Sequence, residues 1–177
     1  MRCMMYIDGG FFWELASLYY ARGKPLGELM NDIHQKVGGA VVSADLFTGR
    51  FSASSAIEHG VLAIEREYES RLLNENIQPH YSIAEEQGGR GRERGVDVAL
   101  AVAAVHGAMT FRPDRVVLIS GDRDLVPMVQ MVQQIGPSVH LIAAQFKRRN
   151  SNGIDKETRT SKVLIKACHE HTWIINE

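Results

Sequence analysis

Aspartates follow two short apolar runs of this sequence, at positions where such residues can do chemistry. Asp8 comes directly after residues 3–7. Asp122 and Asp124 come shortly after residues 116–119. A continuous apolar run of this length is typical of a strand buried on both faces of a parallel sheet. Because α/β folds place ligands at the carboxyl ends of such strands, we expect the three carboxylates to share one edge of a sheet.

A cluster of carboxylates needs cations, because two of them about 4 Å apart repel by roughly 4 kcal/mol at an effective dielectric of 20. Ligands that are all oxygen suit Mg²⁺ or Mn²⁺. Such a site activates water and stabilises a leaving oxygen, which is the chemistry of phosphodiester hydrolysis. No histidine holds a compelling position as general base, so the expected nucleophile is metal-activated water. Ser120 is a candidate hydroxyl contact to the substrate or to that water.

The same aspartates also have a structural interpretation. Asp is a favoured N-cap, because its side chain accepts amide hydrogens of the first helical turn and suits the positive end of the helix dipole. One cap needs one Asp, so the second member of the Asp122 and Asp124 pair is not required for capping. Asp8 with its two following glycines is, taken alone, also typical of a tight turn.

Another carboxylate stands in an apolar stretch. Residues 95–109 are apolar almost all round, which predicts a helix buried on most sides, and Asp97 is their only charged residue. An unpaired buried carboxylate costs several kcal/mol, although near a helix start it can accept amide hydrogens. We therefore include Asp97 in the expected site.

The elements that must position these residues alternate along the chain. Apolar spacing predicts strands at 3–7, 41–47, 79–83, 116–119, 139–143 and 172–175. It predicts helices at 11–19, 26–36, 53–72, 95–109, 125–135 and 161–168. This alternation indicates an α/β fold with a mainly parallel sheet and helices on both faces. The length of 177 residues fits one domain, and 45% hydrophobic residues are enough for a sizeable core.

Two polar stretches are predicted to be loops. Residues 85–95 contain four glycines, three arginines and no apolar residue, and residues 145–162 contain a basic cluster. Guanidinium groups match phosphate oxygens, which makes these stretches candidate phosphate contacts as well as ordinary solvated loops. The candidate substrate-binding residues are Arg90, Arg92, Arg94, Lys147, Arg148 and Arg149.

Overall charge and cysteine usage restrict the class of protein. The net charge of −1 gives no global sign of a nucleic-acid or membrane partner, so a polyanion must be bound by a local basic patch. Cys3 and Cys168 form no CxxC pair, and no signal segment or membrane span is recognisable, so we expect a cytoplasmic protein. Cys168 with the nearby His169 and His171 lacks a second cluster to complete a zinc site.

Three segments resemble a known family. YIDGGFF (6–12), GVDVALAV (95–102) and VLISGDRDLVPMV (117–129) resemble the acidic motifs of NYN domains, the PIN-like group that includes the LabA-like proteins. The resemblance spans nearly the whole chain and implies a single NYN/PIN-like domain over residues 1–177, folded as a three-layer α/β/α sandwich. It also implies metal-dependent RNA cleavage. The catalytic acids and metal ligands that it implies are Asp8, Asp97, Asp122 and Asp124.

The sequence departs from the family pattern at two positions. The family often has Asn where this chain has Phe11, and Asp where it has Ala103. These departures leave open whether the site binds one metal ion or two. They also favour an alternative function, that of a catalytically impaired RNA-binding or regulatory module. Arg94 stands where the family commonly has a basic residue. The sequence distinguishes neither RNA from DNA as substrate nor a monomer from a homo-oligomer.

Two other classes of α/β protein fit poorly. Aspartyl-phosphate phosphatases need a nucleophilic Asp two residues before the second one, and this chain has Tyr6 there. Dinucleotide-binding folds need G-x-G-x-x-G after the first strand, and that motif is missing from this sequence.

Overall fold

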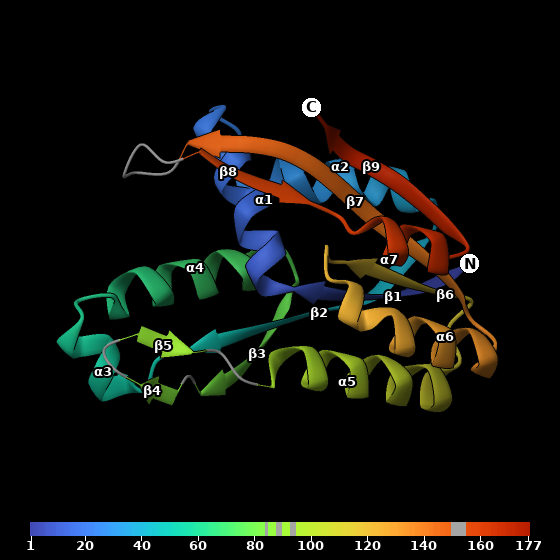
Figure 1. Cartoon of the computed structure of the whole chain (residues 1–177), viewed down its shortest axis with the longest axis horizontal. Coiled ribbons are helices and arrows are strands. Elements are labelled where there is room, and N and C mark those ends of the chain that lie inside the picture. Colours follow the sequence, from blue (N-terminus) through green and yellow to red (C-terminus); the bar gives the residue numbers. More distant parts are fainter. Residues whose placement is uncertain (84, 88–89, 93–94, 150–154) are drawn as a thin grey trace.

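Strands and helices alternate along the chain in the computed structural model, which describes residues 1–83, 85–87, 90–92, 95–149 and 155–177 (Figure 1). The strands are β1 (Arg2–Asp8), β2 (Ala40–Arg50), β3 (Gln78–Ile83), β4 (Glu85–Gln87), β5 (Arg90–Arg92), β6 (Arg115–Ile119), β7 (Ser138–Arg149), β8 (Asp155–Arg159) and β9 (Glu170–Asn176). The helices are α1 (Gly9–Ala21), α2 (Leu26–Val37), α3 (Ala53–Glu58), α4 (Leu62–Asn74), α5 (Val96–Phe111), α6 (Val126–Ile135) and α7 (Lys162–Ala167). A 3₁₀ turn, η1 (Arg123–Leu125), precedes α6.

The central sheet has the strand order β3-β2-β1-β6-β7, and these strands are parallel. The long strand β7 also pairs in parallel with β9 and antiparallel with β8. Because β1 lies directly beside β6, with Ile7 opposite Ile119, the turns that follow these two strands are neighbours at one edge. The expectation that Asp8 and Asp122 share an edge depends on this pairing.

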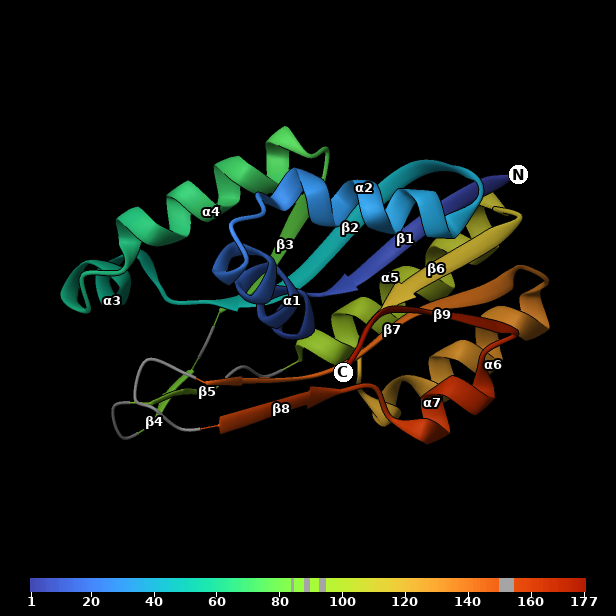
Figure 2. The same cartoon turned by 90° about the horizontal axis from the view of Figure 1, so that it is seen from above.

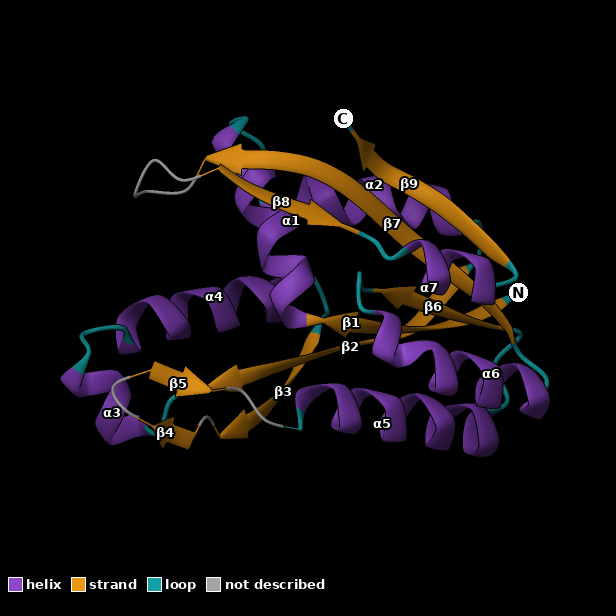
Figure 3. Ribbon diagram, in the orientation of Figure 1, coloured by secondary structure: helices purple, strands orange, loops and turns teal. Residues whose placement is uncertain are grey.

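Helices cover both faces of the sheet, as predicted (Figure 3). Figure 2 shows α2 and α4 on one side of the strands and α6 and α7 on the other. Side chains of β1 alternate between the two cores: Met5 and Ile7 pack toward α1 and α2, whereas Met4 and Tyr6 pack toward α5. The predicted three-layer α/β/α arrangement is therefore confirmed.

The strand that leads to Asp122 is buried as its apolar run predicts. All four side chains of residues 116–119 are inaccessible to solvent. Each fully buried aliphatic side chain of this size contributes about 1.5–3 kcal/mol to folding. This burial fixes the strand, and with it the starting point of the turn that carries Asp122.

The helix predicted over residues 53–72 is wrong in one respect, because it is broken into α3 and α4. Gly60 lies between the two helices with φ of 67°. This left-handed conformation suits glycine and cannot continue an α-helix. The apolar spacing of Ile57 and Val61 continues across the break, which is why periodicity alone misses it.

Both stretches predicted as loops contain strands. Within residues 85–95, β4 and β5 pair antiparallel, with Glu85 opposite Arg92. Within residues 145–162, the end of β7 pairs with β8, with Gln145 opposite Arg159. The loop predictions are wrong at these residues, because an antiparallel ladder forms through backbone hydrogen bonds whatever the charge of the side chains.

Helix α5 is less buried than its apolar sequence predicts. Leu100 and Ala104 are fully buried, whereas Val98, Val102 and Met109 are 65%, 63% and 61% exposed. The sheet and α6 cover two sides of the helix, and the side that carries these three residues faces solvent. No helix in the described part of the chain is long and apolar enough to cross a membrane.

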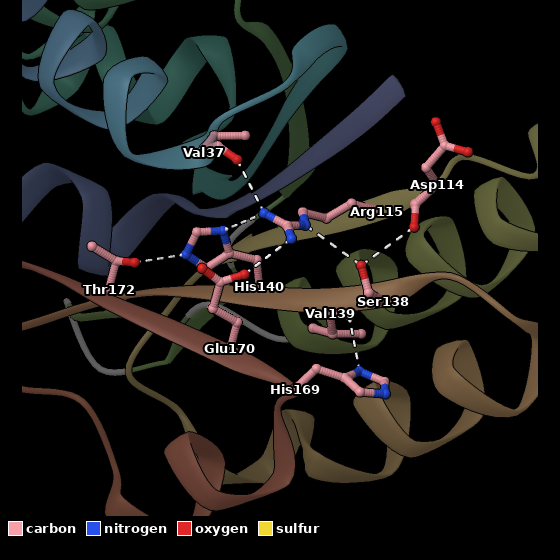
Figure 4. A network of polar contacts seen from close by, with 9 residues as sticks. All are labelled: Val37, Asp114, Arg115, Ser138, Val139, His140, His169, Glu170 and Thr172. Carbon is pink, nitrogen blue, oxygen red and sulfur yellow. Dashed lines mark hydrogen bonds and ion pairs between the residues drawn. The ribbon is translucent and has the colours of Figure 1, made fainter. Parts of the chain in front are cut away.

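A polar network at the amino edge of the sheet joins α2, β6, β7 and β9 (Figure 4). Arg115 donates from Nη1 to the carbonyl of Val37 (3.1 Å) and to Nδ1 of His140 (3.2 Å). Its Nη2 lies 3.0 Å from Oε2 of Glu170. Because Nδ1 of the buried His140 accepts a hydrogen bond, its Nε2 carries the proton and donates to Oγ1 of Thr172 (2.9 Å).

This network makes stability depend on pH. Burial lowers the pKa of His140, with Glu170 opposing and Arg115 adding to the shift. The unfolded chain therefore binds a proton more readily, and the free energy of unfolding falls as pH drops through the ordinary value of 6.5. We expect His140→Gln to lose about 1 kcal/mol at pH 8, from one impaired hydrogen bond, and to show a flatter pH dependence below 6.5.

Urea denaturation from pH 5 to pH 8 measures this effect. The exposed His106 on α5 supplies the matched control, because His106→Gln leaves the network intact. Equal pH dependence of wild type and His140→Gln would contradict the assignment.

Candidate active site

Asp8 ends β1 and caps α1. Its backbone is extended (φ −72°, ψ 113°), and its Oδ1 accepts hydrogen bonds from the amides of Gly10 (3.0 Å) and Phe11 (3.3 Å). The capping interpretation of this residue is therefore correct for one carboxylate oxygen. The other oxygen, Oδ2, accepts a hydrogen bond from Oγ of Ser120 at 2.9 Å.

Ser120 connects the two aspartate turns. Its hydroxyl donates to Asp8 and accepts a hydrogen bond from the backbone amide of Asp122 at 3.1 Å. The residue is fully buried. The sequence predicts Ser120 as a hydroxyl contact to the substrate or to metal-activated water. In the structure it does not belong to the described lining of the cleft, and its hydrogen bonds orient Asp8 relative to the backbone of Asp122.

The Asp8 carboxylate is costly to ionise. Burial raises the pKa of this carboxyl, the hydrogen bonds from Ser120, Phe11 and Gly10 oppose the shift, and the charge of Asp122 adds to it. No lysine or arginine among the described residues is paired with Asp8. A buried carboxylate beside a second one, without a cationic partner, is the electrostatic setting in which a bound cation stabilises the charged form.

A cleft of about 750 Å³ opens at this edge of the sheet. Asp8 and Asp122 line it from the ends of β1 and β6, and Asp97 lines it from the first turn of α5. Asp97 is exposed, so the expected burial of its carboxylate is wrong. The cleft thus brings together carboxylates from three segments that are far apart in the sequence.

Asp124 occupies a different position. Its backbone amide donates to Oδ1 of Asp122 at 2.8 Å, and its own side chain is 77% exposed with Oδ1 3.7 Å from Nε of Arg123. It does not belong to the described lining of the cleft. The structure therefore brings three of the four predicted acids together and leaves the Asp124 carboxylate outside.

Cationic side chains reach the cleft from β8 and β2. Lys156, Arg159 and Arg50 all line it. Nζ of Lys156 lies 2.7 Å from Oε1 of Glu14, whose Oε2 also accepts from Nη2 of Arg148 at 2.8 Å. Burial alone would raise the pKa of Glu14, but these two cations outweigh it and hold the pKa below its ordinary value. Glu14 thus links the β7 and β8 pair to α1.

Comparison with known proteins gives the family. A model of the NYN domain matches residues 10–175, nearly the whole chain. The chain belongs to the NYN domain family. NYN domains are PIN-like, and the family is generally nuclease-like.

Comparison with solved structures supports the fold of this NYN domain. A crystal structure of a protein of unknown function from Vibrio parahaemolyticus is similar, with a TM-score of 0.65 and 17% identity. The similarity covers 98% of the NYN domain and 92% of the Vibrio chain. No curated protein matches the sequence.

The predicted phosphate contacts have different surroundings. Lys147 is exposed on β7, Arg148 is held by Glu14, and Nε of Arg149 lies 3.5 Å from Asp155. None of these three belongs to the described lining of the cleft. Arg90 and Arg92 are in β5 with side chains outside the described part, and Arg94 lies outside the described residues.

Sequence reasoning missed Lys156 and Arg159 because it assigned them to a loop. Antiparallel strands β7 and β8 flank Asn152-Gly153 in the sequence, a pair that is a strong signal for a hairpin. It missed Glu14 as well. Glu14 is the only charged residue of α1, so the criterion that selected Asp97 on its apolar helix would also have selected Glu14.

The structure also shows the surroundings of the two positions at which the sequence departs from the family pattern. Phe11 is buried and lines the cleft, where its ring packs against Gly121. Ala103 packs with the core around α5 and does not belong to the described lining.

The donor set fits a hard divalent cation held by few protein ligands. Within the described residues, no three acidic, histidine or cysteine side chains lie close enough together to hold a metal ion. Ser120, in contrast, connects the Asp8 carboxylate to the backbone amide of Asp122, and the charge of Asp122 raises the pKa of Asp8, which shows that these two carboxylates are neighbours. Mg²⁺ is commonly bound by one or two carboxylates together with waters and substrate phosphates, so two neighbouring carboxylates are sufficient.

Close packing of Gly121 predicts a localised sensitivity to substitution. A Cβ at Gly121 would lie 2.8 Å from the carbonyl oxygen of Arg159 and 2.9 Å from the ring of Phe11. We expect Gly121→Ala to lower the free energy of unfolding by about 1–3 kcal/mol, measured by urea denaturation.

Gly10→Ala is the matched control, because the nearest atom to its Cβ would be Oδ1 of Asp8 at 3.5 Å, an ordinary contact. Alanine should be neutral or stabilising there. Equal effects of the two substitutions would show that Gly121 is not tightly packed.

Proposed function

We propose that this NYN domain is a Mg²⁺- or Mn²⁺-dependent endoribonuclease that hydrolyses phosphodiester bonds in single-stranded or loop RNA, with residues 1–177 acting as one domain. The observation that carries the proposal is the junction of Asp8 and Asp122 through Ser120, in a cleft that Lys156 and Arg159 also line. A phosphodiester offers anionic oxygens to the cations, and unpaired single strands can be splayed out to enter such a cleft.

Asp8 and Asp122 would hold the cation, with Asp97 completing the acidic wall. When bound, a divalent cation supplies an activated water and stabilises negative charge on the phosphate and leaving oxygen. Ser120 keeps Asp8 in place, and the amide of Asp124 does the same for Asp122. In this proposal, the exposed Asp124 carboxylate contributes less than the other three.

Phosphate binding is the role of the basic side chains in this proposal. Arg159 and Lys156 would contact phosphate oxygens within the cleft. Lys147, exposed on the same β7 and β8 pair, would contact the RNA backbone further out.

One alternative is a non-catalytic RNA-binding module on the same fold. Phe11 favours it, because a buried phenyl ring lines the cleft beside Gly121 where the resemblance leads us to expect a polar side chain. The two functions differ in turnover, and both predict RNA binding.

Cleavage of a labelled single-stranded RNA by metal-stripped protein, with Mn²⁺, Mg²⁺ or EDTA added, tests the proposal. Loss of a residue that hydrogen-bonds to a metal ligand typically costs 10–100-fold in activity, so we expect that decrease for Ser120→Ala. Asp8→Asn and Asp122→Asn each replace a carboxylate that would bind the cation directly, and they should lower the cleavage activity at least about 100-fold. Asp114→Asn is the matched control, because Asp114 lies at the opposite edge of the sheet.

Thermal melting with added Mn²⁺ separates cation binding from turnover. At 100 times its dissociation constant, a ligand stabilises the folded state by about 2.7 kcal/mol, and Asp8→Asn should lose this stabilisation. Cutting that persists equally in Asp8→Asn and Asp122→Asn would exclude the proposed site. RNA binding without cutting under any metal would favour the non-catalytic module.

Neutralising Arg159 should reduce the salt dependence of RNA binding. Each phosphate contact to a single strand contributes about 0.7 to the slope of log K against log salt. We expect Arg159→Gln to lower the magnitude of the slope by about that amount, measured by fluorescence anisotropy in EDTA. Lys36→Gln, at an exposed position on α2, should leave the slope unchanged. An unchanged slope for Arg159→Gln would contradict its role.

A further inference from the structure

A second hollow lies beside the cleft and is lined mainly by residues of α1 and α4. Figure 1 shows where these two helices lie in the fold. Its volume is about 310 Å³, near the lower end of the range of roughly 300–1,000 Å³ typical of small-molecule pockets. Trp13 and Tyr20 line it from α1, and Ile64, Tyr68 and Arg71 line it from α4. We call this hollow the aromatic groove.

Large apolar side chains of the aromatic groove remain exposed. Trp13, Tyr20 and Ile64 are 43%, 53% and 58% exposed. Trp13 and Tyr20 are seven residues apart on α1, so they lie on the same helical face, two turns apart. The opposite face of α1 is buried against the sheet, which means that α1 folds without needing the aromatic groove to be covered.

The rings of the aromatic groove are already oriented by protein contacts. The ring centroids of Trp13 and Tyr68 lie 4.7 Å apart with an interplanar angle of 86°. The guanidinium carbon of Arg71 lies 5.0 Å from the centroid of the Tyr20 ring. Preorganised rings lose little conformational entropy when a flat ligand stacks on them.

Tyr68 lines both the aromatic groove and the cleft. Its hydroxyl oxygen is inaccessible to solvent and makes no hydrogen bond to any described residue. Because a ligand in the aromatic groove does not reach a buried atom, the contribution of Tyr68 is its ring, which holds the Trp13 ring in an edge-to-face orientation.

The aromatic groove is continuous with the cleft. Trp13, Ile64 and Tyr68 line both spaces. Trp13 lies five residues after Asp8, a rise of about 7 Å along the axis of α1. A ligand that extended from the carboxylates along α1 would therefore meet Trp13 first and Tyr20 next.

We propose that the aromatic groove binds a nucleobase of the single-stranded RNA whose backbone lies in the cleft, with Trp13 and Tyr20 as stacking surfaces and the Tyr68 ring holding Trp13 in place. The proposal rests on the proposed function and extends it to a base next to the cleaved position. Aromatic side chains beside a basic backbone groove are the usual means of holding single strands. Arg71, which is ion-paired with Glu67 of the same lining, holds the Tyr20 ring by a cation–π contact.

Base-by-base binding measurements test this proposal independently of cleavage. Affinities of short RNAs for metal-free protein are measured by anisotropy, with an abasic site placed at each position in turn. Loss of one base stack costs about 5- to 150-fold. For wild type, an abasic site at one or two positions of the RNA should lower the affinity by such a factor. For Trp13→Ala, an abasic site at the same positions should cause no further loss of affinity.

Several variants separate stacking from folding. Trp13→Phe should retain most of the affinity, and Tyr20→Leu, which keeps an apolar side chain, should lose it. Phe111→Ala is the matched control, because Phe111 is an exposed aromatic (57%) at the far end of α5. With Trp173→Phe as background, emission of Trp13 should be quenched when RNA binds.

The outcomes distinguish this proposal from the nuclease assignment. If wild type cuts RNA in a metal-dependent way and Trp13→Ala and Tyr20→Leu keep their RNA affinity, the proposed base binding in the aromatic groove is wrong and the nuclease assignment is retained. Binding that depends on Trp13 without cutting under any metal would overturn the nuclease and support the aromatic groove. Absence of RNA binding by wild type would overturn both. Self-association lost in Tyr20→Leu, with no response to RNA, would assign the surface to a second copy instead.

Discussion

The hydrogen bond from Ser120 to Asp8 joins two turns that are 112 residues apart in the sequence, and the geometry of the cleft depends on it. It exists because β1 and β6 are neighbours in a parallel sheet, so their carboxyl ends meet at one edge. The apolar side chains of both strands are buried on both faces, which prevents either strand from slipping. Two acidic groups that would repel each other in an open chain are thereby kept close.

Much of this could be predicted from the sequence, because the signals are local. The apolar runs before Asp8 and Asp122 identify their strands. Apolar residues at helical spacing after each turn identify the helices that follow. Parallel order follows from the alternation of the elements. Placing Asp8 and Asp122 at one edge then requires only that β1 and β6 be adjacent, which the structure confirms.

What could not be predicted is set by contacts between distant segments. The segment where β7 and β8 pair is mostly polar, and β8 is held by backbone hydrogen bonds and by the Glu14 ion pair with Lys156 rather than by an apolar pattern. The exposure of one side of α5 depends on how many neighbours surround the helix, which composition does not reveal. Asp124 has the same residue type and nearly the same position as Asp122, and only the geometry of the 3₁₀ turn separates their surroundings.

The cleft also has a consequence for the order of folding. Its walls come from residues near both ends of the sequence, from Asp8 on β1 to Arg159 on β8. Contacts of such long sequence separation form late and slowly, because closing long loops costs entropy before the contact is gained. A growing chain can therefore form β1, α1 and α2 early, but it has no complete cleft until β8 has been synthesised.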